Sequence, residues 1–95
     1  MINSLLPCGT VVLLENKKEK VMIVSHKSFL GNEEGGVALF DYAGIVLPQG
    51  YKGEDDMIFF DASGIKEVLY EGYKDESIID YLEDIKWVEE KFKNE

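Results

Sequence analysis

The sequence contains no arginine, so its ten basic residues are all lysines. Arginine is the residue that most readily binds phosphate or guanine through two hydrogen bonds at once. Nineteen acidic residues oppose the ten lysines and give a net charge of −9. A protein with this charge repels nucleic acids and anionic lipids. We therefore expect neither a nucleic-acid partner nor a membrane partner.

Cysteine and histidine are also scarce, with one residue of each. Cys8 alone can form no internal disulfide and no cysteine-based metal site. As a nucleophile it would need a base, which only His26 could supply, and Ser25 and Ser28 are too close to His26 in sequence to complete a recognisable triad. We predict that Cys8 is a small apolar residue ahead of the first strand and that His26 lies on the surface at a strand end.

Long apolar runs and a secretory leader are missing as well. The longest runs, at 11–14 and 21–24, are far shorter than the ~20 residues that a membrane-spanning helix needs. The first residues have neither the basic region nor the apolar region of a signal peptide. Together with the free cysteine, this predicts a cytoplasmic location. A chain of 95 residues has room for a single domain, 1–95.

Charge is distributed unevenly along the chain. Residues 1–53 hold five acids and five lysines, whereas residues 54–95 hold fourteen acids and five lysines. This pattern is typical of a small binding module whose acidic half faces solvent or a basic partner. With no recognisable acid–base constellation, we predict that the protein is not an enzyme and needs no cofactor.

Short apolar stretches bounded by turn residues predict about five strands, at 9–15, 20–25, 37–43, 57–61 and 65–71. Segment 26–36 is rich in glycine and is predicted to be a loop. If the third strand continues past Gly44, that glycine predicts a bulge or a sharp bend. For 65–71 a helix is the alternative, but Gly64 and Gly72 bracket the segment closely and favour a strand.

The last segment has the clearest helical pattern, from about Asp75 to Phe92, with apolar residues recurring every three or four positions. Asp75 is the predicted N-cap. A β-rich part at about 9–71 and a helix at about 75–92 predict an α+β fold: a small antiparallel β-barrel-like or curled sheet of about five strands with one C-terminal helix.

Two groups of residues are candidates for a site. The first is acidic, and a divalent cation would make it a metal-dependent hydrolase: Glu54, Asp55, Asp56 and Asp61. Consecutive acids point in different directions, so we favour a solvated loop and predict no metal site. The second would bind a protein, with acids that orient a basic partner and aromatic side chains as anchors: Tyr73, Glu83, Asp84, Trp87 and Glu90. The preceding strand would add Glu67 and Glu71, and the alternative surface lies on the β-rich half, around Tyr42 and Tyr51.

Several short motifs occur in an order that resembles one family. They are Leu6-Pro7-Cys8-Gly9-Thr10 with the following Val11–Leu14, Val21-Met22-Ile23, Asp41-Tyr42-Ala43-Gly44, Pro48-Gln49-Gly50, Phe59-Phe60, and Ile65 to Val68 followed by Glu71-Gly72-Tyr73. The chain resembles the short acidic proteins of Gram-positive bacteria that carry the domain of unknown function 4176. Genes of this family are often found beside genes for type VII secretion substrates and LXG toxins.

The resemblance implies a cytoplasmic accessory protein that acts as an adaptor or chaperone for a type VII secretion substrate, and it carries no catalytic motif. The expected partner is a secreted toxin or one of its small helical companions. An immunity-like inhibitor of a toxin and a homo-oligomer without an external partner are the alternatives.

Overall fold

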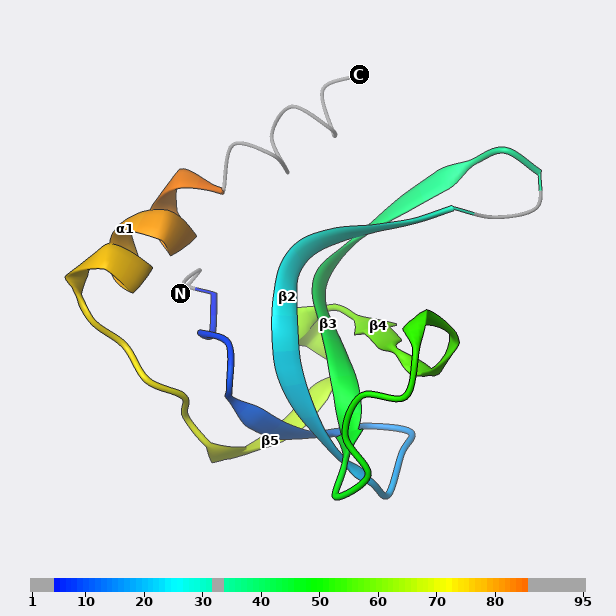
Figure 1. Ribbon diagram of the computed structural model, residues 1–95, viewed down its shortest axis with the longest axis horizontal. Coiled ribbons are helices and arrows are strands. Elements are labelled where there is room, and N and C mark those ends of the chain that lie inside the picture. The colour runs from blue at the N-terminus through cyan, green and yellow to red at the C-terminus, as the bar shows by residue number, and fades with distance from the viewer. Residues whose placement is uncertain (1–4, 32–33, 86–95) are drawn as a thin grey trace.

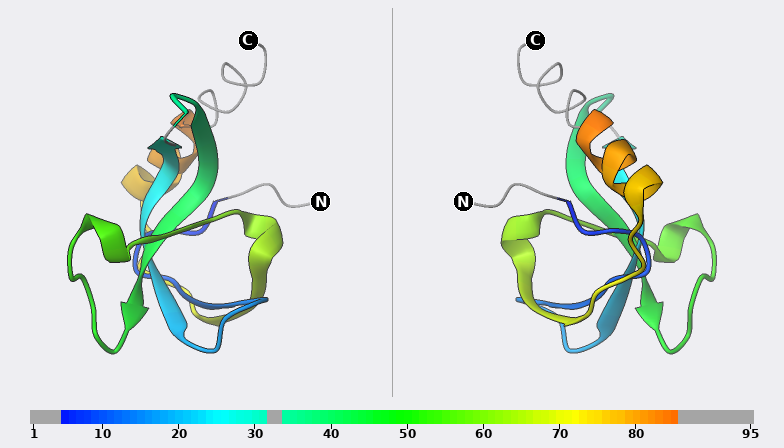
Figure 2. Two further views of the ribbon diagram at one scale, coloured as in Figure 1. Left: turned by 90° about the vertical axis from the view of Figure 1, so that its right-hand side faces the viewer. Right: turned by 90° about the vertical axis from the view of Figure 1, so that its left-hand side faces the viewer.

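The computed structural model describes residues 5–31 and 34–85. Within these residues, five strands form one antiparallel sheet in the order β4-β3-β2-β1-β5 (Figure 1). The strands are β1 (Val11–Leu14), β2 (Lys20–Gly31), β3 (Val37–Leu47), β4 (Ile58–Phe60) and β5 (Ile65–Tyr70). The sheet curls but does not close: β4 and β5 do not pair with each other and form its two edges (Figure 2). The predicted α+β class with a curled sheet is confirmed.

Strands β2 and β3 form a long hairpin, and here the prediction of a loop over 26–36 is wrong. Strand β2 continues to Gly31, which pairs with Val37 at the start of β3. A single residue, Val24, is left over between the pairs Ile23–Gly44 and Ser25–Ala43, so the bulge lies on β2. Polar residues obscured the strand in the sequence, because a hairpin exposed to solvent needs no continuous apolar pattern.

Gly44 lies opposite this irregularity and permits a close approach of two strands. A Cβ atom there would lie 2.6 Å from a Val21 methyl carbon and 2.7 Å from the Met22 carbonyl oxygen. The predicted continuation of the third strand past Gly44 is confirmed, and the glycine is required by lack of space.

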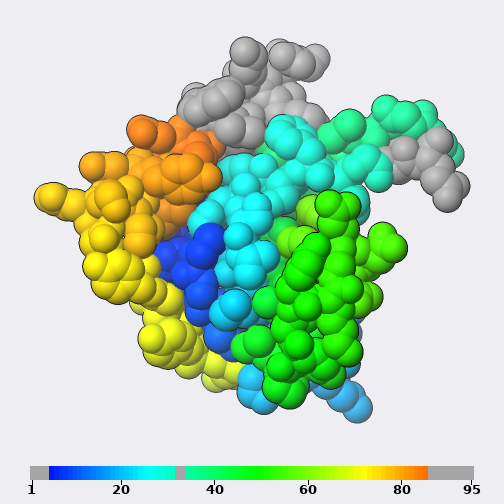
Figure 3. All heavy atoms as spheres, viewed as in Figure 1, coloured from blue at the N-terminus to red at the C-terminus, as the bar shows by residue number. Residues whose placement is uncertain are grey.

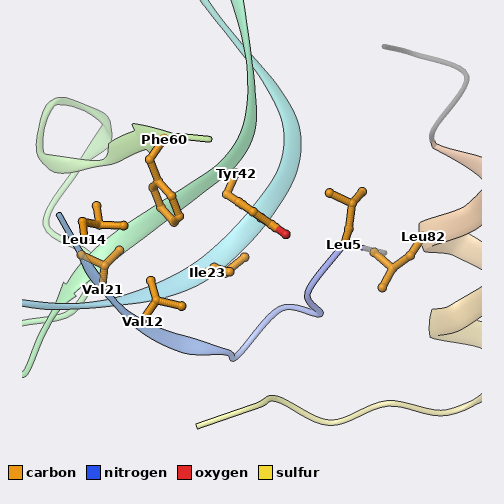
Figure 4. Packing of buried hydrophobic residues seen from close by; sticks show 8 residues of the cluster. All are labelled: Leu5, Val12, Leu14, Val21, Ile23, Tyr42, Phe60 and Leu82. Atoms are coloured by element: carbon orange, nitrogen blue, oxygen red, sulfur yellow. The ribbon is translucent and has the colours of Figure 1, made fainter. Parts of the chain in front are cut away.

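The core lies inside the curl of the sheet (Figure 4). Its buried side chains come from every strand but β5, from the N-terminal segment and from the helix, and they are Leu5, Val12, Leu14, Val21, Ile23, Tyr42, Phe60 and Leu82. Alternation along β1, with Val12 and Leu14 buried, directs every second residue inward. This burial provides the main force that holds the curled sheet together.

Strand β5 pairs with β1, so residues 65–70 form a strand, as the sequence favoured. The pairing is irregular at two places in six residues. After it, Gly72 lies against the N-terminal segment: a Cβ atom there would be 2.4 Å from the Cys8 carbonyl oxygen, and the Gly72 amide donates to the Thr10 hydroxyl at 3.0 Å. The turn between sheet and helix is therefore fixed by close packing.

Helix α1 (Glu76–Asp84) begins where the sequence predicted. The Asp75 carboxylate accepts a hydrogen bond from the Ile78 amide at 3.0 Å, which confirms Asp75 as the N-cap. Leu82 is the helix residue buried in the core. The rest of the predicted helix, up to Phe92, lies outside the described residues. None of the helices within 5–31 and 34–85 has the length and apolar character needed to span a membrane.

Candidate protein-binding surface

The predicted acidic surface on the helix is only partly within the described residues. Glu83 and Asp84 are exposed near the end of α1, and Tyr73 is 69% exposed just before it. Trp87 and Glu90 lie outside the described residues. Tyr73 precedes the start of α1 at Glu76, whereas Glu83 and Asp84 are its last two residues. The structure thus exposes Tyr73, Glu83 and Asp84 and places them at opposite ends of α1.

Tyr73 also contributes to the start of the helix. Its hydroxyl donates to the Asp75 carboxylate at 3.2 Å, and the Ser77 hydroxyl donates to the same carboxylate at 2.7 Å. Hydrogen bonds from Ser77 and from the Ile78 amide lower the pKa of Asp75. Tyr73 is therefore held next to a charged cap, with its ring turned to solvent.

The sequence suggested an alternative binding surface around Tyr42 and Tyr51, and this prediction is wrong for Tyr42. Tyr42 is 1% exposed and belongs to the core, whereas Tyr51 is 62% exposed on the loop after β3. Tyr42 packs its ring against Phe60, with centroids 5.5 Å apart, and its hydroxyl accepts a hydrogen bond from the Leu6 amide at 3.0 Å. A tyrosine can be buried in this way when its hydroxyl finds a partner.

The acids considered as a metal site do not come together. Glu54, Asp55 and Asp56 form the short helix η1 and are all exposed. Asp61 instead accepts a hydrogen bond from the Asp41 amide at 2.9 Å. Within the part of the chain that the structure describes, no three His, Cys, Asp or Glu side chains are placed to hold a metal ion.

His26 is not at a strand end, as the sequence had suggested, but in the middle of β2 and half-buried. Its Nε2–H donates to the Leu6 carbonyl at 2.6 Å, which leaves Nδ1 as an acceptor facing the Cys8 sulfur at 4.0 Å. Its ring also lies 6.0 Å from that of Tyr42 and 6.2 Å from that of Tyr81, centroid to centroid. The structure therefore brings together a thiol and an imidazole that lie far apart in the sequence.

The surroundings of the Cys8 thiol and the His26 imidazole favour the neutral form of both groups. Desolvation raises the pKa of the Cys8 thiol and lowers the pKa of His26, and nearby Lys27 lowers the His26 pKa further. A nucleophilic cysteine needs the opposite shifts, which favour a thiolate beside an imidazolium. Tyr42 accepts a hydrogen bond from the Leu6 amide and His26 donates one to the Leu6 carbonyl, which fixes the N-terminal segment against the sheet.

Next to His26, Lys27 is buried and paired with Asp41. Their nitrogen and oxygen lie 2.9 Å apart, and the Lys27 side chain is 5% exposed. The second Asp41 oxygen accepts a hydrogen bond from the Ala62 amide at 2.9 Å. Lys27 has a φ of 46°, a conformation in which residues other than glycine are uncommon. This network joins β2, β3 and the segment after β4.

Beyond this network, the hairpin projects from the molecule as a two-stranded arm, which we define as residues 28–31 and 37–40 (Figure 3). Strand β1 pairs with β2 only as far as Met22, and β4 pairs with β3 only at 42–44. The arm exposes large apolar side chains: Phe29 is 52% exposed, Leu30 44% and Val37 52%.

A groove lies between the arm and the segment that contains η1. Its volume is about 400 Å³, and its walls are formed by Phe29 and Leu30 from the arm and by four residues of segment 54–59: Glu54, Asp55, Met57 and Phe59. Phe59 also contacts Phe40 of the arm, with ring centroids 6.0 Å apart. The groove combines an apolar surface with two carboxylates.

Sequence reasoning missed both the arm and the groove. The missed indication was a pair of apolar stretches, Phe29-Leu30 and Val37-Ala38, on either side of a glycine-containing turn. This is the pattern of a hairpin. The groove could not have been found in the same way, because its two walls are more than twenty residues apart in the chain.

One comparison identifies a family. The family model described as "Domain of unknown function (DUF4176)" matches residues 5–80. No curated protein and no solved structure matches the chain. The match covers the sheet, the N-terminal segment and the first turn of α1.

Proposed function

This chain belongs to the DUF4176 family, and from that premise we propose that it is a non-enzymatic accessory protein, an adaptor or chaperone that binds a substrate of type VII secretion. The observation that carries the proposal is the arm, whose apolar side chains extend into solvent from a two-stranded hairpin. The type VII substrate as partner rests on the resemblance found in the sequence.

A two-stranded hairpin buries too little apolar surface to be stable by itself in water. Here the buried pair of Lys27 and Asp41 and the ring contact of Phe40 with Phe59 hold its base. Large apolar side chains left in solvent beside such a base are typical of a protein-binding surface. The arm therefore supports a function in which a partner covers it.

The net charge of −9 supports a partner with basic surface. Charge of one sign increases the rate of association with a partner of the other sign and disfavours partners of the same sign. The exposed acids of α1, among them Glu83 and Asp84, would contribute to this effect. They favour the second candidate function as well, an immunity-like inhibitor that covers the basic cleft of a toxin.

Co-purification tests the proposal. The protein is co-expressed with type VII secretion substrates from the same genome, and the complex is isolated through a tag on the substrate. We expect Leu30→Ser with Val37→Ser to reduce capture at least tenfold, because apolar anchors account for most of the affinity at such surfaces. The matched control is Val68→Ser with Leu69→Ser on β5, where the exposed fractions, 44% and 40%, are similar.

Three results would contradict the proposal. Wild-type protein that fails to capture the substrate removes the adaptor function, and equal capture by the arm variant and the wild type removes the arm as its surface. Secretion of the substrate from cells that lack this protein would also count against an adaptor. Survival of toxin-expressing cells through this protein alone would favour the immunity function instead.

A further inference from the structure

We propose that the groove between the arm and η1 receives a basic segment of the partner protein, with an apolar side chain in the groove and a lysine or arginine beside Glu54 and Asp55. This inference rests on the proposed function and names the chemistry of the segment that the protein recognises. The occupant is a stretch of polypeptide in which apolar and basic residues are neighbours.

The shape of the groove supports an apolar anchor. A volume of about 400 Å³ is within the range of ligand-binding pockets, and four of the six lining side chains are apolar: Phe29, Leu30, Met57 and Phe59. Met57 and Phe59 are half-buried, so one wall is already supported by the sheet. An apolar side chain placed there would be covered from two sides, by the arm and by β4.

The charge of the groove determines which residues of the partner can lie beside its apolar anchor. Its remaining lining residues, Glu54 and Asp55, are both carboxylates, and both are exposed. Asp56 follows them in η1 without lining the groove. A neutral or acidic segment would desolvate these carboxylates without compensation, whereas a lysine or arginine would pair with them.

The same charge argues against other occupants. Nucleic acid would place phosphates against carboxylates in a protein of net charge −9. A second copy of this chain would bring a second charge of −9, although its turn with Lys17 and Lys18 offers the required cations. We commit to a different protein, and self-association is an outcome that the experiment detects.

Titration with synthetic peptides tests the inference directly. The probes are three acetylated and amidated peptides of twelve residues: one alternates leucine or phenylalanine with lysine, one replaces its lysines by glutamates, and one replaces its apolar residues by serines. Each is added to ¹⁵N-labelled full-length protein and followed by amide chemical shifts. We expect the first peptide alone to bind, with the largest shifts at the six residues that line the groove.

Charge variants complete the test. Exposed ion pairs each contribute little to affinity, so Glu54→Gln with Asp55→Asn should weaken binding of the basic peptide roughly fivefold and reduce its salt dependence. Glu15→Gln with Glu19→Gln, in the turn after β1, is the matched control, because it makes the same change in net charge at exposed positions that do not line the groove. This control should leave the affinity within about twofold of the wild type.

The inference is overturned if the basic peptide does not bind, if the acidic peptide binds as tightly, or if the shifts map to α1. It is also overturned if the two double variants weaken binding equally, or if light scattering shows that the chain fills the groove by dimerising. These outcomes differ from failure of the proposed function. Suppose that the arm variant loses the secretion substrate but the variant Glu54→Gln with Asp55→Asn still binds it. The adaptor function is then still supported, and the groove alone is excluded as the binding site.

Discussion

At the scale of single residues, Gly44 shows how little space separates β2 from β3. A side chain there would meet the Met22 carbonyl, which belongs to the backbone and cannot rotate away. We expect Gly44→Ala to lower the free energy of unfolding by about 1–3 kcal/mol, as for other overpacked interiors. Urea denaturation measures the change. Gly64→Ala is the control, because a Cβ atom at Gly64 has no neighbour within 4 Å; equal effects of the two substitutions would contradict this account.

Asp41 is the residue on which the base of the arm depends. It accepts hydrogen bonds from buried Lys27 and from the Ala62 amide. Asp41→Ala leaves a buried ammonium group without this counterion, and we expect a loss of about 3–5 kcal/mol in the free energy of unfolding. Lys27→Met with Asp41→Ala should be more stable than Asp41→Ala alone, because no cation is then buried. A double variant that is less stable than the single one would show that the ion pair is not the reason.

His26 makes stability depend on pH. Burial lowers its pKa in the folded protein below the ordinary value of 6.5, so the unfolded chain binds a proton more readily than the folded one. The contribution of neutral His26 is therefore complete above pH 6.5 and is lost as the pH falls below that value. We expect the free energy of unfolding to fall between pH 7.5 and 5.5, and to fall less in His26→Gln. Identical pH dependence in both proteins would exclude His26 as the cause.

At the scale of elements, α1 packs against the core through buried Leu82 and half-buried Ile78. Leu82 is 6% exposed, whereas its helix neighbours Ile79 and Tyr81 are 47% and 53% exposed. We expect Leu82→Ala to lower the free energy of unfolding by about 2–5 kcal/mol, and Ile79→Ala to change it by less than about 1 kcal/mol. Thermal denaturation followed by circular dichroism measures both. Equal losses would mean that the helix packs through a different face.

At the scale of the whole molecule, the charge of −9 acts against the folded state. Asp41 pairs with Lys27 at 2.9 Å and Glu71 with Lys74 at 2.8 Å, but the acids outnumber the lysines by nine in the whole sequence. Salt screens repulsion between exposed charges beyond about 10 Å at 0.1 M. We expect the thermal midpoint to rise as sodium chloride increases from 0.02 to about 0.5 M. A midpoint that falls with salt would indicate that attractive pairs outweigh the repulsion.

How much the sequence could predict depended on the range of the interactions. Asp75 capped the helix as predicted because an N-cap needs only residues within three positions. The strand at 65–70 was recognised from its flanking glycines. Residues 26–31 were misassigned because their polar residues and the glycines after them suggested a loop, although the apolar pairs Phe29-Leu30 and Val37-Ala38 indicated a hairpin.

By itself, the sequence determined the class of fold, the charge, and the elements whose apolar pattern is local, since each of these depends on composition or on near neighbours. Only the tertiary structure decided the rest. It buried Tyr42, placed Cys8 next to His26, paired Lys27 with Asp41, and placed η1 beside the arm. The physical reason is the curl of the sheet. Once the strands pair and bend around the core, side chains from distant parts of the chain meet, and no local pattern records which of them will do so.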